Sequence, residues 1–224
     1  MNKCEFEKIE SFMLSCMKDS AHDKEHVYRV LYTALDIAKT ETVDYDILIT
    51  ACLLHDIGRP EETADATVNH AIVGSVKAYN WLEEQGYSET FAKTVKECIA
   101  SHRYRKKEGG IPSTIEAKIL YDADKLDTCG AMGIARTLLW LGRTDKLLNQ
   151  LTDNSGIDFE SNEITFIEEF NYKLKKLYGS FYTERANEIA DNRKITAEDF
   201  YNNILNEIQS VYHSKENLEQ VLDI

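Results

Sequence analysis

The stretch Leu53-Leu54-His55-Asp56-Ile57-Gly58-Arg59-Pro60 decides how this chain folds. Residues 47–54 are apolar except for Thr50, which predicts a buried helix, and Gly58 and Pro60 are signals that end it. A histidine and a carboxylate therefore stand side by side at the end of that helix. Because consecutive helical side chains point about 100° apart, both can bind one metal ion only near the helix terminus. A buried carboxylate without a partner is very costly, so we expect other segments to supply partners.

Other segments carry histidine or aspartate in helical surroundings and could supply those partners. Together with His55-Asp56, these candidate residues follow one another along the chain as a histidine, the His-Asp pair, two single histidines and an aspartate. The segments are Asp23-Lys24-Glu25-His26-Val27-Tyr28-Arg29-Val30, then His70-Ala71-Ile72-Val73-Gly74 and Ile99-Ala100-Ser101-His102-Arg103, and finally Ile119-Leu120-Tyr121-Asp122-Ala123-Asp124-Lys125-Leu126-Asp127.

This ordered set resembles the HD superfamily of metal-dependent phosphohydrolases, in which H…HD…D holds the primary metal. The resemblance covers residues 23–136, about half of the chain, and includes the patterns DxxHxxRV and DADKLD. A lone HD dipeptide is a weak signal, whereas the ordered set is specific. The chain is most similar to small stand-alone bacterial HD phosphohydrolases, some of which act on nucleoside triphosphates. The resemblance implies an all-α HD-domain helical bundle with additional C-terminal helices.

The resemblance also implies the metal ligands, which are His26, His55, Asp56 and Asp124. Any one of them alone is more often a core histidine or a solvated acid, but the four in order favour a metal site. Asp124 is chosen because the family's metal aspartate in D-x-D-K-x-D directly precedes the lysine. Asp122 is then either a carboxylate that contacts the metal ligands without binding the metal or a structural residue. Asp127 is expected to pair with a basic residue on a helix face.

Two imidazoles and two carboxylates suit Mn, Fe, Zn or Ni better than Mg or Ca. A structural zinc site would instead favour cysteine ligands and a closed shell of four protein groups. We expect one divalent ion, with manganese preferred and Fe, Zn, Ni, Co or Mg as alternatives.

His70 and His102 occupy positions where two-metal HD phosphodiesterases keep extra ligands. This sequence has Ser101-His102 where those proteins have two adjacent histidines, so one ligand of a second metal is absent. We therefore expect His70 and His102, together with Lys125, to contact phosphate or move protons. The alternative for either histidine is a structural role inside a helix.

Basic residues near these motifs could bind phosphate. We assign this role to Arg29, Arg59, Arg103 and Arg105, and leave Lys106 and Lys107 as a solvated charge run.

The chemistry expected of this site is hydrolysis by a metal-activated water. A nucleophilic serine or cysteine motif is not visible, and neither GxxxxGK[ST] nor GxGxxG occurs. The resemblance favours nucleoside and deoxynucleoside triphosphates as substrates, and it also favours release of pyrophosphate. The alternatives are a phosphodiesterase or nucleotidase of the same fold, a nucleotide-sensing protein without turnover, and a two-iron oxygenase, which the missing histidine disfavours.

Composition sets the surroundings of this chemistry. The chain has 224 residues, of which 43% are hydrophobic and 29% charged, as in a soluble globular protein. We expect one domain over residues 1–224, with the motifs in about 20–140 and a C-terminal helical extension in about 163–213. The net charge of −13 disfavours a nucleic acid polymer as partner, since phosphate binding needs a basic field. A small phosphorylated substrate remains compatible with it, and a homodimer is a further expectation.

The five cysteines form no CxxC pair, and we interpret them as reduced residues of a cytoplasmic protein. No apolar run approaches the roughly 20 residues of a membrane span, and the N-terminus does not resemble a signal peptide.

Hydrophobic periodicity and capping signals predict helices and no strand. Asp23, Asp44 or Tyr45, and Ser88 are expected to start helices, Gly86 to end one, and Ser113 with Glu116 to form a capping box. Residues 59–67 and 142–162 are expected to be loops. The expected helices are 3–18, 23–39, 44–56, 68–85, 88–102, 113–126, 134–141, 167–177, 182–190 and 198–211.

Overall fold

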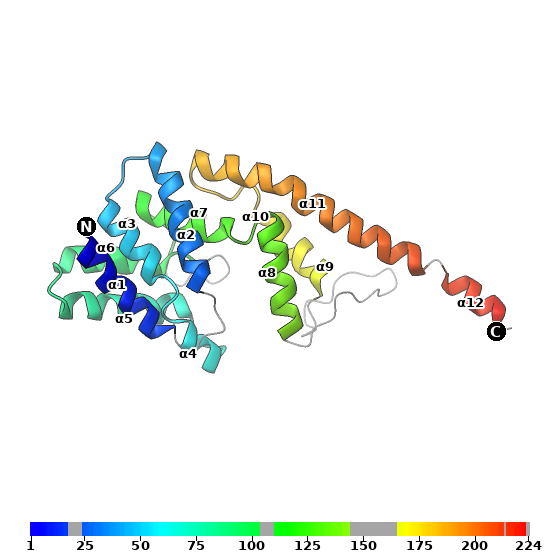
Figure 1. Cartoon of the computed structure of the whole chain (residues 1–224), viewed down its shortest axis with the longest axis horizontal. Helices are drawn as coiled ribbons and strands as arrows, with labels where there is room; N and C mark the ends of the chain where they lie inside the picture. Colours follow the sequence, from blue (N-terminus) through cyan, green and yellow to red (C-terminus); the bar gives the residue numbers. More distant parts are fainter. Residues whose placement is uncertain (18–23, 104–109, 144–164, 213, 223–224) are drawn as a thin grey trace. The chain divides into compact units, whose positions relative to one another are not determined.

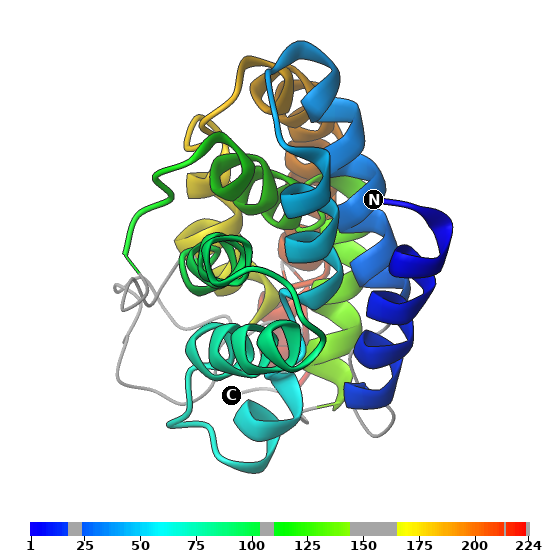
Figure 2. The ribbon, with the colours of Figure 1, turned by 90° about the vertical axis from the view of Figure 1, so that its left-hand side faces the viewer.

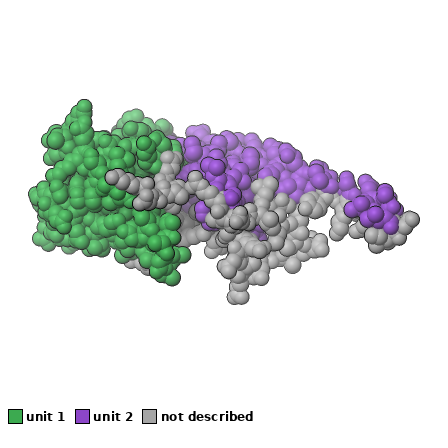
Figure 3. Space-filling model, turned by 60° about the horizontal axis from the view of Figure 1, so that its bottom comes forward, with its two compact units in different colours: residues 1–127, 181–187 green, residues 128–180, 188–224 purple. Residues whose placement is uncertain are grey.

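The computed structural model of the chain describes residues 1–17, 24–103, 110–143, 165–212 and 214–222. In these residues every regular element is a helix, which confirms the all-α prediction (Figure 1). The chain divides into two compact units, coloured separately in Figure 3. Unit 1 comprises Met1–Asp127 and Phe181–Asn187, and unit 2 comprises Thr128–Ser180 and Glu188–Ile224. The expectation of one domain over the whole chain stays a prediction.

Unit 1 is built around helix α3 (Tyr45–Leu54). Apolar side chains around this helix are fully buried, Leu48 and Leu53 among them, because other helices of the unit contact it from several sides (Figure 2). Its partners are α1 (Lys3–Cys16), α2 (Lys24–Ile37), α5 (His70–Glu84), α6 (Glu89–Ala100) and α7 (Ile115–Leu126). A short 3-10 turn, η1 (Ala38–Thr40), follows α2. The apolar run of residues 47–54 is therefore the centre of unit 1.

Several helix boundaries follow the predicted local signals. The Asp44 side chain accepts hydrogen bonds from the backbone N–H groups of Asp46 and Ile47, and Ser88 accepts one from Phe91. Gly86, with φ of 84°, follows α5 in the left-handed conformation that favours glycine. Asp23 lies outside the described residues.

Two predictions about local structure in unit 1 are wrong. Residues 59–67 are not all loop, since α4 (Arg59–Ala64) begins just after Gly58; proline fits the first turn of a new helix as well as it ends an old one. The capping box is also wrong, because Thr114 rather than Ser113 caps α7. Glu116 instead accepts a 2.9 Å hydrogen bond from the backbone N–H of Asp44, which ties α7 to the start of α3.

Unit 2 contains α8 (Gly130–Arg143), α9 (Phe166–Glu169), the π-helical turn η3 (Phe170–Leu174), α10 (Lys175–Leu177), most of α11 (Glu184–Tyr212) and α12 (Lys215–Val221). The two helices predicted over 182–190 and 198–211 are one helix, α11. The connecting residues contain neither glycine nor proline, so nothing in them ends a helix. Of the loop predicted over 142–162, residues from 144 onwards lie outside the described part of the chain.

A close backbone crossing positions the end of α3 against α5. A Cβ atom on Gly58 would lie 2.3 Å from the carbonyl oxygen of His70 and 2.7 Å from the backbone nitrogen of Gly74. A Cβ atom on Gly74 would in turn lie 3.1 Å from the nitrogen of Gly58. Glycine at both positions lets the His55-Asp56 turn approach the helix that begins with His70. Among the described helices, none combines the length and apolarity that a membrane span requires.

Candidate metal centre

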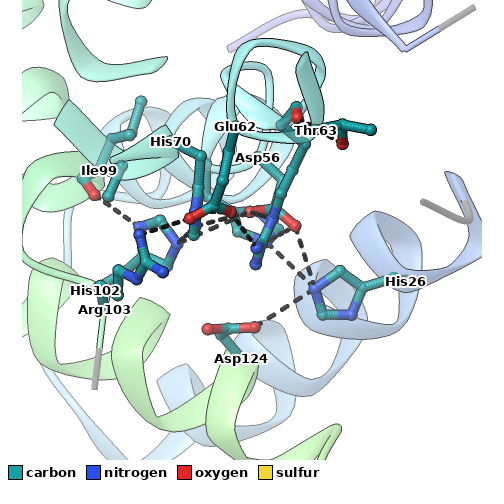
Figure 4. Close-up of polar contacts among 12 residues, drawn as sticks. His26, Asp56, Glu62, Thr63, His70, Ile99, His102, Arg103 and Asp124 are labelled. Carbon is teal, nitrogen blue, oxygen red and sulfur yellow. Dashed lines mark hydrogen bonds and ion pairs between the residues drawn. The ribbon is translucent and has the colours of Figure 1, made fainter. Parts of the chain in front are cut away.

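Six buried side chains, which lie on or just after five different helices, converge at one end of α3, and Figure 4 labels all of them except His55. Each of them is at most 5% exposed. They are His26 on α2, His55 and Asp56 just after α3, His70 at the start of α5, His102 just after α6, and Asp124 on α7. The structure thus brings together all four predicted metal ligands and both predicted catalytic histidines.

All four histidines are held in the same way. In each, Nδ1 lies within hydrogen-bond distance of an oxygen that can only accept, so Nδ1 carries the proton and Nε2 presents its lone pair to the centre. The acceptors are Asp127 Oδ2 for His26 at 2.7 Å, the carbonyl of Cys52 for His55 at 2.8 Å, Glu62 Oε2 for His70 at 2.8 Å and the carbonyl of Ile99 for His102 at 2.6 Å.

The first group of donor atoms surrounds Nε2 of His26. His55 Nε2 lies 3.4 Å from it, Asp124 Oδ1 3.3 Å and Asp56 Oδ2 3.6 Å. Atoms bound to one ion at about 2.0–2.2 Å stand about 3.0–3.6 Å apart, so these spacings fit a single transition-metal ion. Asp56 Oδ2 is buried and has no hydrogen-bond partner among the described residues. An orphaned carboxylate oxygen among imidazole lone pairs is costly unless a cation joins them, so the residues fit a metal.

The charges around His26 also favour a cation. Burial alone would lower the pKa of His26, but Asp124 and Asp127 raise it above its usual value. Burial would raise the pKa of Asp56, yet the Arg59 guanidinium and His55 hold it well below its usual range. For Asp124, burial is likewise overcome by Lys125 and His26, which keep its pKa low. The two carboxylates are therefore ionised, as metal ligands must be.

Asp127 and Arg29 lie behind His26. Arg29 Nε donates to Asp127 Oδ1 at 2.7 Å, and Arg29 Nη2 donates to Oδ2 at 3.1 Å. Asp127 has the basic partner that was predicted for it, and it also fixes the ring of His26. Arg29 was predicted to bind phosphate, and the structure places its guanidinium on this carboxylate.

A second group consists of Asp56, His70 and His102. Oδ1 of Asp56 lies 3.4 Å from Nε2 of His70 and 3.7 Å from Nε2 of His102, and these two nitrogens are 3.3 Å apart. Both nitrogens present lone pairs, so their facing positions repel unless a proton or a cation lies between them. Burial lowers the pKa of His70 to about 4, so this ring is neutral at neutral pH. Ser101, where a second histidine was noted as missing, turns its hydroxyl to the carbonyl of Glu97 at 2.8 Å.

Glu62, which was not among the predicted site residues, connects His70 of the second group to Arg59 and Arg103. Figure 4 labels Glu62, His70 and Arg103. Glu62 accepts from His70 Nδ1 at 2.8 Å, from Arg59 Nη1 at 2.9 Å and from Arg103 Nη1 at 2.7 Å. Although burial would raise the pKa of Glu62, His70 and the two arginines lower it to about 2. The sequence feature that could have indicated Glu62 is its spacing from Arg59. The two are three residues apart, which places them on one face only if residues 59–64 are helical.

The remaining predicted residues fall into three places. Lys125 Nζ contacts Asp124 Oδ2, and Arg59 Nε donates to Asp56 Oδ1 at 3.0 Å, so each of these cations contacts a carboxylate that was predicted to bind the metal. Asp122 faces away from these ligands and accepts hydrogen bonds from Tyr182 and Thr183, as the structural alternative required. Arg105 lies outside the described residues, as do Lys106 and Lys107.

Comparisons with known proteins identify the family of the chain. The HD domain model matches residues 24–129. The uncharacterized protein YpgQ of Bacillus subtilis is 32% identical over 192 residues, which are 84% of this chain and 85% of that protein. A crystal structure of an HD-superfamily hydrolase from Bacillus thuringiensis is 29% identical, with a TM-score of 0.71 and coverage of 92% of this chain and 98% of that one. The crystal structure of Bacillus subtilis YpgQ in complex with ADP is 27% identical, with a TM-score of 0.64 and coverage of 93% and 97%.

Proposed function

This chain belongs to the HD superfamily and is a metal-dependent phosphohydrolase, and we propose that its substrates are nucleoside and deoxynucleoside triphosphates. The orphaned Asp56 Oδ2 among imidazole lone pairs is the observation that carries the metal-dependent chemistry. The ADP complex of YpgQ, a similar protein, supports a nucleotide as the ligand.

His26, His55, Asp56 and Asp124 would hold one divalent ion, for which we propose manganese. Such an ion supplies a bound water of lowered pKa and neutralises charge on a phosphoryl oxygen. The Arg59 guanidinium supports a single ion, because it donates to Asp56 Oδ1, the oxygen that would have to bind a second. The cationic group already placed there would repel another cation.

His70 and His102 would take up the proton released by the attacking water. Their Nε2 atoms face each other at 3.3 Å, and one proton between them converts the repulsion of two lone pairs into a hydrogen bond. Glu62 keeps the other nitrogen of His70 protonated, so the inward nitrogen is free to accept. Positioned proton transfer of this kind contributes roughly 10²- to 10⁴-fold to a rate.

Arg59, Arg103 and Lys125 would hold the phosphate chain. Their side chains are no more than 22% exposed, and each contacts a carboxylate of the site. Arg103 also donates to Asn69 Oδ1 at 3.2 Å, so Glu62 and Asn69 fix it from two directions. A clamp that recognises phosphates and not bases predicts modest discrimination among the four bases.

A substrate panel tests this proposal. Purified protein is incubated with triphosphates, monophosphates and cyclic phosphodiesters, each with Mn, Mg, Zn, Ni and Co, and products are separated by anion-exchange chromatography. We expect Mn-dependent turnover of triphosphates to monophosphate and pyrophosphate. Diphosphate and phosphate would show attack at the γ-phosphorus. Inertness toward every triphosphate, with turnover of a monophosphate or a diester, would favour the nucleotidase or phosphodiesterase alternative, and binding without turnover would favour a nucleotide sensor.

The choice of Asp124 over Asp122 gives a further prediction. Asp124→Asn should lower Mn affinity by more than the roughly 10- to 100-fold typical of outer partners of metal ligands. Asp122→Asn should leave the affinity nearly intact and lower thermal stability, because Asp122 binds the start of α11. Metal titration of the two variants compares them directly. The reverse ranking would mean that the wrong carboxylate was assigned.

A separate prediction concerns Glu62. Glu62→Gln should lower kcat by about tenfold or more, a part of what positioned proton transfer contributes, while Mn affinity stays close to that of the wild type. Glu61→Gln is the matched control, because Glu61 pairs with Lys77 at 2.8 Å and not with the histidines. Steady-state kinetics across pH measures both variants. An equal loss of kcat in both variants would mean that Glu62 stabilises α4 and does not act through His70.

A further inference from the structure

Asp122 fixes a distant segment of the chain beside the metal-ligand helix α7. This carboxylate is fully buried and accepts several hydrogen bonds. The donors are the backbone N–H of Tyr182 at 2.9 Å, that of Thr183 at 2.8 Å and the Thr183 hydroxyl at 2.7 Å. Residues 181–183 are therefore held firmly against α7, although 60 residues separate Asp122 from Tyr182.

Residues 181–183 place the exposed aromatic ring of Tyr182 beside α7. The ring of Tyr182 meets that of Tyr121 on α7 with centroids 5.1 Å apart and planes at 75°. An edge-to-face contact covers at most one face of a ring, so Tyr121 leaves at least one face of Tyr182 uncovered. Tyr182 is 41% exposed, whereas Tyr121, the ring that packs against it, is 5% exposed.

The two rings continue outward from the metal ligands. Asp124 and Lys125 each lie about one turn after Tyr121 on α7, at the spacings i,i+3 and i,i+4 that bring side chains together. Lys125 Nζ contacts Asp124 Oδ2 and also lies 5.6 Å from the centroid of the Tyr121 ring. The order is thus a metal-ligand carboxylate, a cation, a buried ring and an exposed ring. A nucleotide has the same order of groups, since its phosphates are followed by the sugar and then by an aromatic base.

We propose that Tyr182 is the stacking platform for the nucleobase of the substrate, supported by Tyr121 and held in place by Asp122. This inference rests on the proposed function for the identity of the ligand as a nucleotide. Every base has a π-face, so stacking binds all four with little preference. The platform therefore supplies affinity for the nucleoside half of the substrate without adding base selectivity to the phosphate clamp.

The test compares a ligand with a base and one without it. Calorimetry in Mn²⁺ measures the dissociation constants of ADP and of inorganic pyrophosphate. Tyr182→Ala should weaken ADP binding by about 5- to 150-fold, the range expected for loss of one base–aromatic stack. Pyrophosphate binding should be unchanged, and Tyr182→Phe should bind ADP like the wild type. Tyr182→Leu, which keeps an apolar contact with Tyr121 but has no ring, should lose as much as Tyr182→Ala.

Tyr45→Ala is the control, because Tyr45 is 47% exposed but starts α3, about 15 Å along the helix from the site. Wild-type ADP affinity in Tyr182→Ala or Tyr182→Leu would overturn the proposal. An equal loss of pyrophosphate binding in those variants would also overturn it, because the effect would then be structural. The readout is binding, so it separates this inference from the proposed reaction. If the wild type hydrolyses no triphosphate but ADP binding depends on Tyr182 as described, the result supports the base-binding site and contradicts the proposed reaction.

Discussion

Asp56→Ala is expected to abolish metal binding and to lower the hydrolytic rate by about 10³-fold or more. A metal ion contributes several kcal/mol of transition-state stabilisation, and each 1.4 kcal/mol is a factor of about ten in rate. Asp56 is fully ionised, and its Oδ2 lies 3.6 Å from Nε2 of both His26 and His55. Without Asp56, the candidate site keeps its imidazole ligands but has one carboxylate ligand instead of two.

The variant is measured by metal content after gel filtration and by turnover of ATP with Mn²⁺. Arg59 keeps its contact with Glu62, so helical content by circular dichroism should be close to that of the wild type. Asp65→Ala is a suitable control, because the exposed Asp65 side chain bonds locally to Thr67, and no bond from it to the site is seen in the described part of the chain. Full metal occupancy and turnover in Asp56→Ala would remove Asp56 from the ligand set.

Gly58→Ala is expected to destabilise the protein by about 3 kcal/mol or more, at the upper end of the cost of overpacking. The new Cβ would lie 2.3 Å from the carbonyl oxygen of His70 and 2.7 Å from the nitrogen of Gly74, and both are backbone atoms. Since neither can rotate away, α5 must shift and carry His70 with it. For a chain of this size, that loss corresponds to a drop in Tm of roughly 6–12 °C.

Gly142→Ala is the matched control for Gly58→Ala. Gly142 lies within α8, and a Cβ there would meet no atom within 4 Å among those described. Replacing a helical glycine by alanine in open space should raise stability by about 1 kcal/mol, so the two variants should move in opposite directions. Differential scanning calorimetry measures both. An unchanged Tm in Gly58→Ala would show that the end of α3 does not approach α5 as closely as described.

Much of the fold could be predicted because its signals are local. Asp44 and Ser88 start helices with their own side chains, and the apolar run before His55 marks the central helix. The candidate ligands His26, His55, Asp56 and Asp124 could be named from the family order alone, without any knowledge of distance. The structure adds their convergence, which no local pattern contains.

Other features depend on contacts between distant segments, and the sequence does not contain these in readable form. Glu62 has a function only because α4 brings it to His70 and Arg103. Arg29 was predicted to bind phosphate because it is a basic residue in the motif that carries His26, but its guanidinium donates to Asp127, 98 residues later. The continuity of α11 was missed for another reason, since its polar middle has no apolar stripe to reveal the helical period.

Anomalous diffraction from crystals grown with Mn²⁺ tests the central claim most directly. The account predicts one strong peak per protomer, within bonding distance of His26 Nε2, His55 Nε2, Asp56 Oδ2 and an Asp124 oxygen. A peak only between Asp56, His70 and His102, or no peak near Asp56, would contradict it.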